Sequence, residues 1–392
     1  MIRKLSELDL RGKSVFLRVD FNVPIDRGKV SEPHRIDSAL PTIRFILERA
    51  AKLIIASHLG RPDGKIVAKY SLAPVRDYLE QALGYPVVLA PDCVGPAVEH
   101  LARDPSHRVI LLENLRFHKE EEENDRAFSQ ALAALAEVYV NDAFGAAHRA
   151  HASIAGMVEF FKLKAAGFLM QKELDYLSPI LTNPPRPFVT ILGGAKVSDK
   201  IGVIRNLLPK VDSLLIGGAM AYTFLKARGI EVGSSLVEFD KTAVADEILK
   251  EAAGRGVKLL LPVDHVTGDA EKKNPTTCEN PIPGQRMGLD VGPKTTALFV
   301  DEIQRAKMVL WNGPVGLFEV PPYDQGSRAL AHTLAESSPA TVSVIAGGDT
   351  VAAVTAAGVA SKIAHLSTGG GAALEFLEGK VLPGIQALEE PR

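Results

Sequence analysis

Short apolar segments of this chain end repeatedly in glycines or in polar side chains of the kind that bind phosphate. In the second half, four such segments are followed by Gly193-Gly194-Ala195-Lys196, Gly217-Gly218, Asn312-Gly313-Pro314 and Gly347-Gly348-Asp349-Thr350. If the segments are parallel strands, their carboxyl ends meet at one edge of a sheet, which is where ligands bind in open α/β sheets. The pattern therefore predicts a ligand site made of these turns.

The first half of the chain ends its apolar segments in polar side chains instead of glycine pairs. Asp20 and Asn22 follow one segment, and His58 and Arg61 follow another. A carboxylate such as Asp20 accepts a hydrogen bond from a hydroxyl group, so a hydroxylated acid would suit this position. For His58 a hydrogen-bonding role is favoured over metal binding, because no second histidine or cysteine lies at ligand spacing.

Four arginines, Arg35, Arg61, Arg116 and Arg149, follow or flank predicted strand ends. The guanidinium group grips carboxylate and phosphate in a bidentate manner. Each arginine taken alone is an ordinary solvated surface residue, but their position at strand ends favours convergence on a small ligand with several negative charges. Two crevices of different chemistry predict two ligands brought face to face.

In the second half, Lys196 and Lys200 are four residues apart and would share one face of a helix start. A surface helix would explain Lys200, but not the glycine pair directly before Lys196. Asp349 supplies the single carboxylate with which nucleotide enzymes usually hold Mg²⁺ next to phosphate oxygens. The turn Gly369-Gly370-Gly371-Ala372 offers further backbone N–H donors. Glu319 could bind ribose hydroxyls, although alone it is an ordinary surface acid.

Two familiar nucleotide-binding sequences are missing. Arg11-Gly12-Lys13-Ser14 contains the last three residues of a G-x-x-x-x-G-K-[ST] loop, but Glu7 stands where the first glycine is needed. No G-x-G-x-x-G follows a strand, which argues against a nicotinamide dehydrogenase. A nucleotide site in this chain must be of another type.

Composition limits the class of protein. The 392 residues are too many for one core, so two domains are expected. The net charge of −2, from 45 basic and 47 acidic residues, argues against general binding to nucleic acid or to anionic membranes. Two cysteines without CxxC spacing predict neither a disulfide framework nor a zinc site. The start of the chain lacks the apolar core of a signal peptide, so a cytoplasmic location is expected.

Strand-like and helix-like segments alternate, which predicts an α/β fold whose parallel sheets are covered on both faces. The expected elements include strands at Ser14–Val19, Leu53–Ser57, Val109–Leu112 and Val138–Val140, and helices at Ile36–Ala51 and Ala127–Ala136. Glu120–Glu123 favours a solvated helix start. A helix over Ala165–Leu177 is predicted to end at Ser178-Pro179, before the proline-rich Asn183–Pro187. The predicted domains are residues 1–164 and 188–380, joined by the helix and hinge at 165–187.

These residues together resemble phosphoglycerate kinase over nearly the whole chain. The matching motifs are Arg18-Val19-Asp20-Phe21-Asn22-Val23-Pro24, Ser57-His58-Leu59-Gly60-Arg61-Pro62, Leu112-Glu113-Asn114-Leu115-Arg116-Phe117, Ala147-His148-Arg149-Ala150-His151, Gly193-Gly194-Ala195-Lys196-Val197, Trp311-Asn312-Gly313-Pro314-Val315-Gly316 and Gly347-Gly348-Asp349-Thr350. The resemblance implies two Rossmann-like three-layer (αβα) domains that face each other across a cleft. It also implies reversible transfer between 1,3-bisphosphoglycerate with ADP and 3-phosphoglycerate with ATP, using Mg²⁺, by a cytoplasmic glycolytic enzyme that works as a monomer.

The resemblance also assigns residues. It implies that phosphoglycerate is held by Asp20, Phe21, Asn22, Arg35, His58, Leu59, Gly60, Arg61, Arg116 and Arg149. It implies that the nucleotide is held by Gly193, Lys200, Gly217, Gly218, Gly288, Asn312, Glu319, Gly347, Gly348, Asp349 and Thr350. Arg35, Lys196 and Gly371 would be catalytic, Asp349 would hold Mg²⁺, and the tail Val381–Arg392 would return to the N-terminal domain.

The chain departs from the family pattern at two positions. Ala219 follows Gly217-Gly218, and Ala346 precedes Gly347-Gly348, where many relatives have a third glycine. Because alanine disfavours positive φ, these changes put only the fine geometry of the nucleotide site in question. A non-catalytic binding protein on the same fold is the remaining alternative, and it would not need Lys196, Asp349 and the arginines together.

Overall fold

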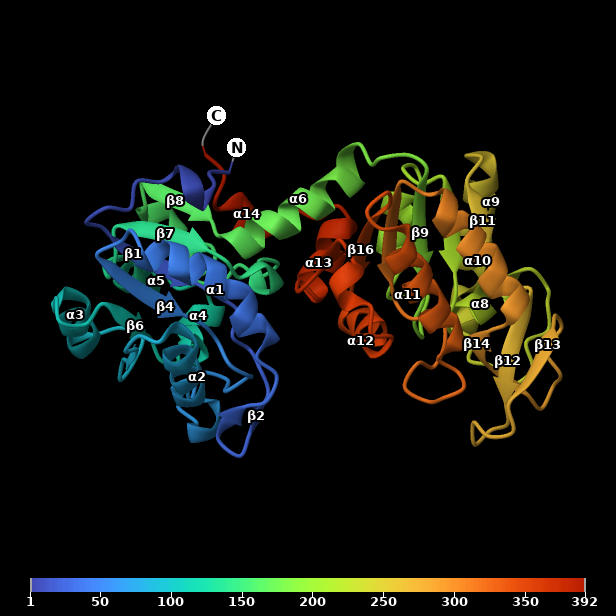
Figure 1. Ribbon diagram of the computed structural model, residues 1–392, viewed down its shortest axis with the longest axis horizontal. Coiled ribbons are helices and arrows are strands. Elements are labelled where there is room, and N and C mark those ends of the chain that lie inside the picture. Colours follow the sequence, from blue (N-terminus) through green and yellow to red (C-terminus); the bar gives the residue numbers. More distant parts are fainter. Residues whose placement is uncertain (1, 391–392) are drawn as a thin grey trace. The chain divides into compact units, whose positions relative to one another are not determined.

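The computed structural model describes residues 2–390, and these form two compact units (Figure 1). The first unit runs to Asp175 and takes back the chain from Val381 onward, and the second is Tyr176–Lys380. The boundary lies inside the segment 165–187 that the sequence assigns to the connecting helix and hinge.

The first unit is built on a six-stranded sheet in which every pair of neighbours is parallel. Its spatial order is β5-β6-β4-β1-β7-β8. The strands are β1 (Ser14–Arg18), β4 (Lys52–Ala56), β5 (Val88–Leu89), β6 (Val109–Leu111), β7 (Val138–Asn141) and β8 (Leu163–Ala166), with a separate hairpin of β2 (Ile25–Asp26) and β3 (Lys29–Val30). The helices are α1 (His34–Leu47), α2 (Ala73–Leu83), α3 (Pro96–Arg103), α4 (Lys119–Glu122), α5 (Arg126–Ala133) and α14 (Pro383–Gln386).

Both faces of this sheet are covered, which is why its strands are apolar without alternation. Val15 and Leu17 of β1 belong to one core with Ile43 of α1 and Leu79 of α2. Phe16, between them in the sequence, faces the other way and stacks on Tyr139 with ring centroids 6.2 Å apart. Figure 1 shows α1 and α2 over one face of the sheet.

The second unit repeats this plan with the parallel order β11-β10-β9-β15-β16-β17 and adds an antiparallel sheet, β13-β12-β14. The strands are β9 (Phe188–Leu192), β10 (Ser213–Ile216), β11 (Lys258–Leu260), β12 (Asp264–Gly268), β13 (Thr276–Glu279), β14 (Met287–Val291), β15 (Met308–Asn312), β16 (Val342–Ala346) and β17 (His365–Leu366). The helices are α7 (Ile201–Leu207), α8 (Met220–Ala227), α9 (Thr242–Gly254), α10 (Pro293–Arg305), α11 (Gln325–Ser337), α12 (Gly348–Ala356) and α13 (Gly371–Leu377). The predicted α/β class with two parallel sheets is confirmed.

The helix predicted over Ala165–Leu177 is wrong at both ends. Ala165 and Ala166 belong to strand β8, because edge pairing with β7 overrides the preference of alanine for helix. Helix α6 (Phe168–Thr182) begins after them and continues through Pro179 instead of stopping there. Only the donor at the nitrogen of Pro179 is lost, and the N–H of Asn183 still donates to the carbonyl of Pro179 at 3.0 Å.

The returning tail contacts the first unit at several points within residues 381–390. The N–H of Gly384 donates to the carbonyl of Ala147 at 2.9 Å, and Nζ of Lys164 donates to the carbonyl of Ala387 at 2.6 Å. The predicted tail also includes residues 391 and 392, which lie outside the described residues.

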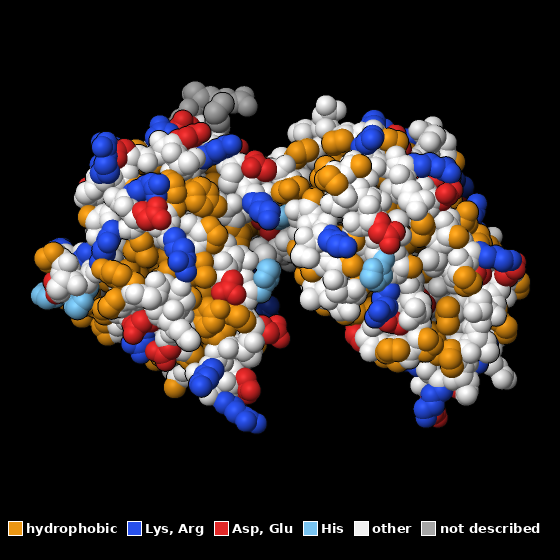
Figure 2. All heavy atoms as spheres, viewed as in Figure 1, with side chains coloured by type: hydrophobic (Ala, Val, Ile, Leu, Met, Phe, Trp, Pro, Cys, Tyr) orange, Lys and Arg blue, Asp and Glu red, His pale blue; other side chains and the backbone are white. Residues whose placement is uncertain are grey.

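Acidic and basic side chains are interspersed over the surface in view in Figure 2, in keeping with the small net charge. Within residues 2–390, no helix combines the length and the apolar character that crossing a membrane requires.

The start of α6 is fixed by two side chains of the first unit. Oδ1 of Asp142 accepts from the N–H of Met170 at 3.0 Å, and Oγ1 of Thr42 accepts from the N–H of Phe168 at 2.9 Å. These bonds satisfy N–H groups that have no partner inside a first helical turn. Burial raises the pKa of Asp142 to about 6, against 3.8 for an ordinary aspartate.

This raised pKa predicts a pH-dependent stability. Between pH 5 and pH 7 the native state retains a proton that the unfolded state has released, so ionisation of Asp142 lowers the free energy of unfolding by about 1 kcal/mol over this range. The Asp142→Asn variant has no such ionisation. From pH 5 to pH 7 we therefore expect the free energy of unfolding of wild type to fall by that amount relative to that of the variant. Urea denaturation followed by far-UV circular dichroism at pH 5, 6 and 7 measures it, and a difference independent of pH would contradict the assignment.

Candidate functional site

The ends of β1 and β4 lie side by side in the first unit and bring Asp20 and His58 together. Nε2 of His58 lies 3.9 Å from Oδ1 of Asp20. Next to them, Oδ1 of Asn22 accepts from the N–H of Gly60 at 2.9 Å, which ties the two strand-end loops to each other. Four of the residues predicted for phosphoglycerate therefore form one connected group.

Three of the predicted arginines belong to the same region, although they come from different elements. From α1, Nη1 of Arg35 donates to Oδ2 of Asp20 at 2.5 Å. From the turn Leu115–Phe117, Nη1 of Arg116 donates to the carbonyl of Gly60 at 2.9 Å. The charge of Arg149 acts on Arg116, which places it near this cluster as well. The result is a concentration of positive charge around one hydroxyl-accepting carboxylate.

His58 is a neutral ring in this site. Burial, followed by the charges of Arg18 and Arg116, holds its pKa well below its usual range. Nη2 of Arg18 lies 3.3 Å from Nδ1 of His58. Since arginine can only donate, Nδ1 must accept and the ring proton lies on Nε2, which faces Asp20. This geometry suits a hydrogen-bonding group, which is the role the sequence favours.

The other predicted residues of this half differ in exposure. Phe21 and Leu59 are buried in the core, so their side chains support the loops rather than face a ligand. The N–H of Phe21 is also occupied, because it donates to Oγ of Ser57 at 2.8 Å. Arg61 is exposed directly after Gly60.

A buried ion network under this site was missed from the sequence. Nε of Arg18 donates to Oγ of Ser153 at 2.7 Å, and Ser153 donates to Oε1 of Glu121 at 2.6 Å. Arg18 and Glu121 are both completely buried. The solvated start expected for Glu120–Glu123 is therefore wrong for Glu121, which points inward to balance Arg18 while its neighbours remain near the surface. No local pattern in an acidic run distinguishes the one residue that faces inward.

In the second unit, the ends of β9 and β15 are joined by their backbones. The N–H of Gly193 donates to the carbonyl of Asn312 at 3.0 Å, and the N–H of Gly194 donates to the carbonyl of Pro314 at 3.0 Å. A Cβ atom on Gly193 would lie 2.1 Å from the carbonyl oxygen of Pro314, so only glycine permits this approach.

Asn312 and Thr350 extend this joint to β16 and α12. Oδ1 of Asn312 accepts from Nζ of Lys200, while its Nδ2 donates to the carbonyl of Ala346 at 2.7 Å. Oγ1 of Thr350 accepts from the N–H of Gly313 at 2.7 Å. Burial lowers the pKa of Lys200. Together with the backbone bonds of Gly193 and Gly194, these contacts join the ends of β9, β15 and β16 to the start of α12.

A polar hollow lies at these strand ends. Its lining includes most of the predicted nucleotide residues, namely Gly193, Lys200, Asn312, Gly347, Gly348, Asp349 and Thr350, and also Lys196 and Gly371, which were predicted to be catalytic. The helix α12 begins at Gly348, so its N-terminal N–H groups and partial positive charge lie at the hollow. Backbone donors, two lysines and the carboxylates of Asp199 and Asp349 are groups that bind phosphates together with a divalent metal.

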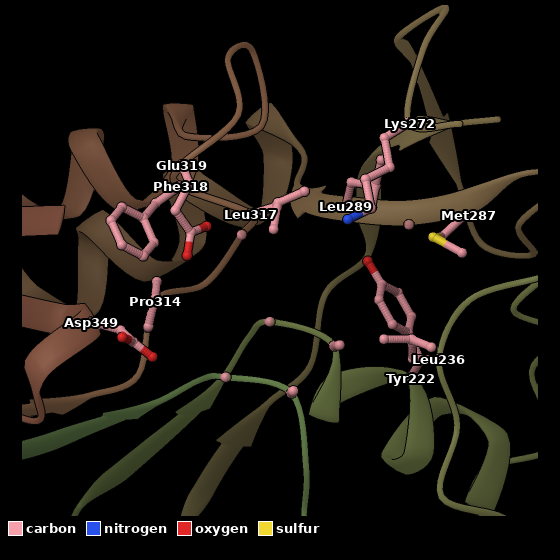
Figure 3. Close-up of a pocket in the computed structure, with 16 residues that line it drawn as sticks. Tyr222, Leu236, Lys272, Met287, Leu289, Pro314, Leu317, Phe318, Glu319 and Asp349 are labelled. Atoms are coloured by element: carbon pink, nitrogen blue, oxygen red, sulfur yellow. The ribbon is translucent and has the colours of Figure 1, made fainter. Parts of the chain in front are cut away.

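An apolar pocket adjoins the polar hollow and shares Gly194, Ala195, Pro314 and Asp349 with it. The predicted Gly218, Gly288 and Glu319 lie in its lining. Figure 3 shows Pro314, Phe318, Glu319 and Asp349 along one side and Tyr222, Leu236 and Met287 along the other. Such a pocket fits a flat, largely apolar group such as a nucleobase.

The apolar walls of this pocket were missed from the sequence. They are formed by Tyr222, Leu236, Met287, Leu289, Leu317 and Phe318. These residues come from α8, from β14 and from loops. Because apolar side chains are the ordinary content of helices and strands, their types carry no signal until the fold brings them together.

The two alanines that depart from the family pattern fit their positions. Ala219 has a φ of −66°, and Ala346 is not among the residues with positive φ. Neither position requires the left-handed backbone that would favour glycine.

Comparisons with known proteins identify the same relationship over the whole chain. The family model described as Phosphoglycerate kinase matches residues 5–380. The chain is 56% identical to a phosphoglycerate kinase of Anaeromyxobacter dehalogenans (strain 2CP-C), with 99% of this chain and 100% of that protein covered. It is 54% identical to one of Koribacter versatilis (strain Ellin345), with 98% of each covered. The structure of phosphoglycerate kinase from Coxiella burnetii matches with a TM-score of 0.90 and 40% identity over 99% of each chain.

The close approach at Gly193 makes a stability prediction with a matched control. Gly193→Ala should destabilise the second unit by about 1–3 kcal/mol, because a methyl group would force two backbones apart. Gly348→Ala should change stability by less than about 0.5 kcal/mol, since nothing lies within 4 Å of its added Cβ. Urea denaturation followed by the fluorescence of the single tryptophan, Trp311 in β15, reports on this unit. Equal effects of the two substitutions would contradict the packing argument.

Proposed function

Because the chain belongs to the phosphoglycerate kinase family, we propose that its two half-sites carry out the family reaction as described below. The reaction is the reversible transfer of a phosphoryl group between 1,3-bisphosphoglycerate with ADP and 3-phosphoglycerate with ATP. The observation that carries the proposal is the pairing of two complementary half-sites in one chain. One presents side-chain cations around Asp20, and the other presents backbone N–H groups beside an apolar pocket.

The first half-site holds 3-phosphoglycerate. Arg35, Arg116, Arg149 and the exposed Arg61 supply positive charge for its phosphate and carboxylate groups. Asp20 accepts from the hydroxyl group, and Asn22 and His58 complete the hydrogen bonds. A neutral His58 suits this role, because its ring accepts from Arg18 and keeps a proton on the nitrogen that faces Asp20.

The second half-site holds the nucleotide. The base enters the apolar pocket lined by Gly288 and Tyr222, and Glu319 is available to the ribose hydroxyls. The phosphates occupy the polar hollow, where α12 and Lys200 provide donors and charge. Gly217 and Gly218 follow β10 at the same edge and allow close approach of the backbone.

The chemical step needs no general base, since the attacking group is already an anion in both directions. It is a carboxylate in one direction and an ADP phosphate oxygen in the other. Catalysis then depends on aligning the two substrates and on neutralising the charge of the phosphoryl group during its transfer. We propose that Lys196 and Arg35 do this, with the N–H of Gly371, which lines the polar hollow at the start of α13, as a further donor.

Mg²⁺ fits this arrangement as part of the proposal. Asp349 lines both the phosphate hollow and the apolar pocket, and one carboxylate together with phosphate oxygens is the usual way in which nucleotide enzymes hold this ion. The ion would add positive charge beside the phosphates, and Lys196 would remain free to act on the transferred group.

Water must be kept out during transfer, because the acyl phosphate would otherwise hydrolyse. We therefore include in the proposal that the two units close over the reactants in each turnover, with α6 and the proline-rich segment after it as the hinge. A monomer working in the cytoplasm stays a prediction from the family resemblance.

A coupled assay tests the activity directly. Protein, 3-phosphoglycerate, ATP and Mg²⁺ are combined, and the product is reduced by glyceraldehyde-3-phosphate dehydrogenase while NADH loss is followed. We expect turnover that stops when Mg²⁺ is chelated and resumes when it is restored. Folded protein that binds both substrates without turnover would favour a binding role instead.

Two substitutions in different half-sites distinguish catalysis from binding. Lys196→Ala should lower kcat on the order of a hundredfold and leave both KM values nearly unchanged, since its charge acts on the group in transit. Arg61→Ala should weaken 3-phosphoglycerate binding about tenfold or more, and it should leave ADP affinity intact. Steady-state kinetics and calorimetry measure both effects. A change confined to KM in the lysine variant, or loss of both ligands in the arginine variant, would contradict these roles.

A further inference from the structure

One cysteine, one histidine and one aspartate meet in the first unit, outside the residues assigned to either substrate. Asp92 and Cys93 lie in the loop between β5 and α3, and His118 lies just before α4. The sulfur, one ring nitrogen and one carboxylate oxygen all lie within 4.8 Å of one another. Among residues 2–390 this is the one group of three or more such side chains close enough to share a metal ion.

We propose that Asp92, Cys93 and His118 form a binding site for a soft divalent cation of the zinc type. Zn²⁺ takes thiolate, imidazole and carboxylate ligands in tetrahedral sites, often with water in the fourth position. Mg²⁺ prefers oxygen ligands alone, so this site is chemically different from the one proposed at Asp349.

The three side chains are already held in place. Oδ1 of Asp92 accepts from the N–H of Cys93 at 2.6 Å and lies 2.5 Å from Nε2 of His118. Sγ of Cys93 lies 3.0 Å from the carbonyl oxygen of Glu113, which is a further oxygen at the site. The ring of His118 packs against Phe128 with centroids 5.0 Å apart, and this limits its rotation. A cation would need only small shifts of side chains to be surrounded.

Charge and exposure also suit a cation. Burial and then the carboxylates of Asp92, Glu121 and Glu113 hold the pKa of the Cys93 thiol well above its usual range, so the sulfur lies in a negative field and a bound cation would have to displace its proton. Cys93 is completely buried, whereas the side chains of His118 and Asp92 are 25% and 42% exposed. The ion would enter past the histidine and aspartate and reach the sulfur at the base, and the thiol proton would leave to solvent.

The site was excluded by the sequence argument because the chain has no CxxC spacing. That argument applies only to sites whose ligands are close in the sequence. Here Asp92 and Cys93 are adjacent, but His118 lies 25 residues beyond Cys93, and the fold brings it to them.

Occupancy would also affect a neighbouring segment. The chain between Glu113 and His118 carries Asn114, whose side chain bonds to both backbone groups of Leu59, and Arg116, which donates to Gly60. A cation that joins Asp92 to His118 would fasten this segment to the β5–α3 loop. Its binding should therefore stabilise the first unit.

Co²⁺ is the probe that reports on the ligands, because a thiolate-to-cobalt charge-transfer band appears only when sulfur is bound. The full chain is titrated with Co²⁺ and then Zn²⁺ under a reductant that does not chelate, with excess Mg²⁺ present. We expect one cobalt bound with this band, its displacement by Zn²⁺, and a rise in melting temperature with Zn²⁺.

Matched variants identify the residues. Cys93→Ser and His118→Gln should each lose the band and weaken Zn²⁺ binding at least about tenfold, whereas Cys278→Ser in the second unit should behave as wild type. Kinase activity and melting temperature without added Zn²⁺ show whether each variant folds. If Cys93→Ser does not fold, His118→Gln and Asp92→Asn provide the same comparison. A wild type without the band, or Zn²⁺ binding that persists in the folded variants, would overturn the proposal.

Discussion

The backbone contact between the ends of β9 and β15 is the constraint on which the second half-site depends. Gly193 and Gly194 bond to the carbonyls of Asn312 and Pro314, and no side chain fits at Gly193. This contact fixes Asn312, whose amide then holds Lys200 on one side and the end of β16 on the other. The start of α12, and with it the row of free N–H groups, follows from that position. In this half-site the backbone contacts come first, and they position the side chains and the helix start proposed to bind phosphate.

The first half-site is built from charged side chains instead of backbone groups, and their charges must be balanced. Arg18 is completely buried under the site, and such a charge is costly unless it is paired and hydrogen-bonded. Glu121 and Ser153 supply that pairing. Arg35 and Arg116 are paired with Asp20 and Glu122, so the positive charge at the site is only partly balanced, and Arg149 adds to it. A small acid with two anionic ends needs side chains at several angles, whereas the phosphates of a nucleotide need a row of donors.

The sequence predicts best what is local. The strand ends before Gly193-Gly194 and before Asp20 were recognised because the residue types that end a strand there are also the types that bind a ligand. The start of α6 was wrong because pairing with β7 decides that Ala165 is a strand residue. Glu121 was misjudged because its partner, Ser153, is distant in the sequence. The walls of the apolar pocket were not predicted, because Tyr222 and Phe318 look like ordinary core residues in the sequence and only the fold brings them together.

The two lysines of the polar hollow differ in their surroundings, and this bears on how the proposed transfer is divided between them. Lys200 is partly buried and its ammonium group is held by Asn312, so it can neutralise only charge that stays in one place. Lys196 is exposed at the end of the glycine turn and has a flexible stem. A phosphoryl group that moves between two acceptors needs one cation that remains with the nucleotide and one that follows the charge. In the reaction we propose, Lys200 supplies the first and Lys196 the second, which a pair of equally fixed cations could not do.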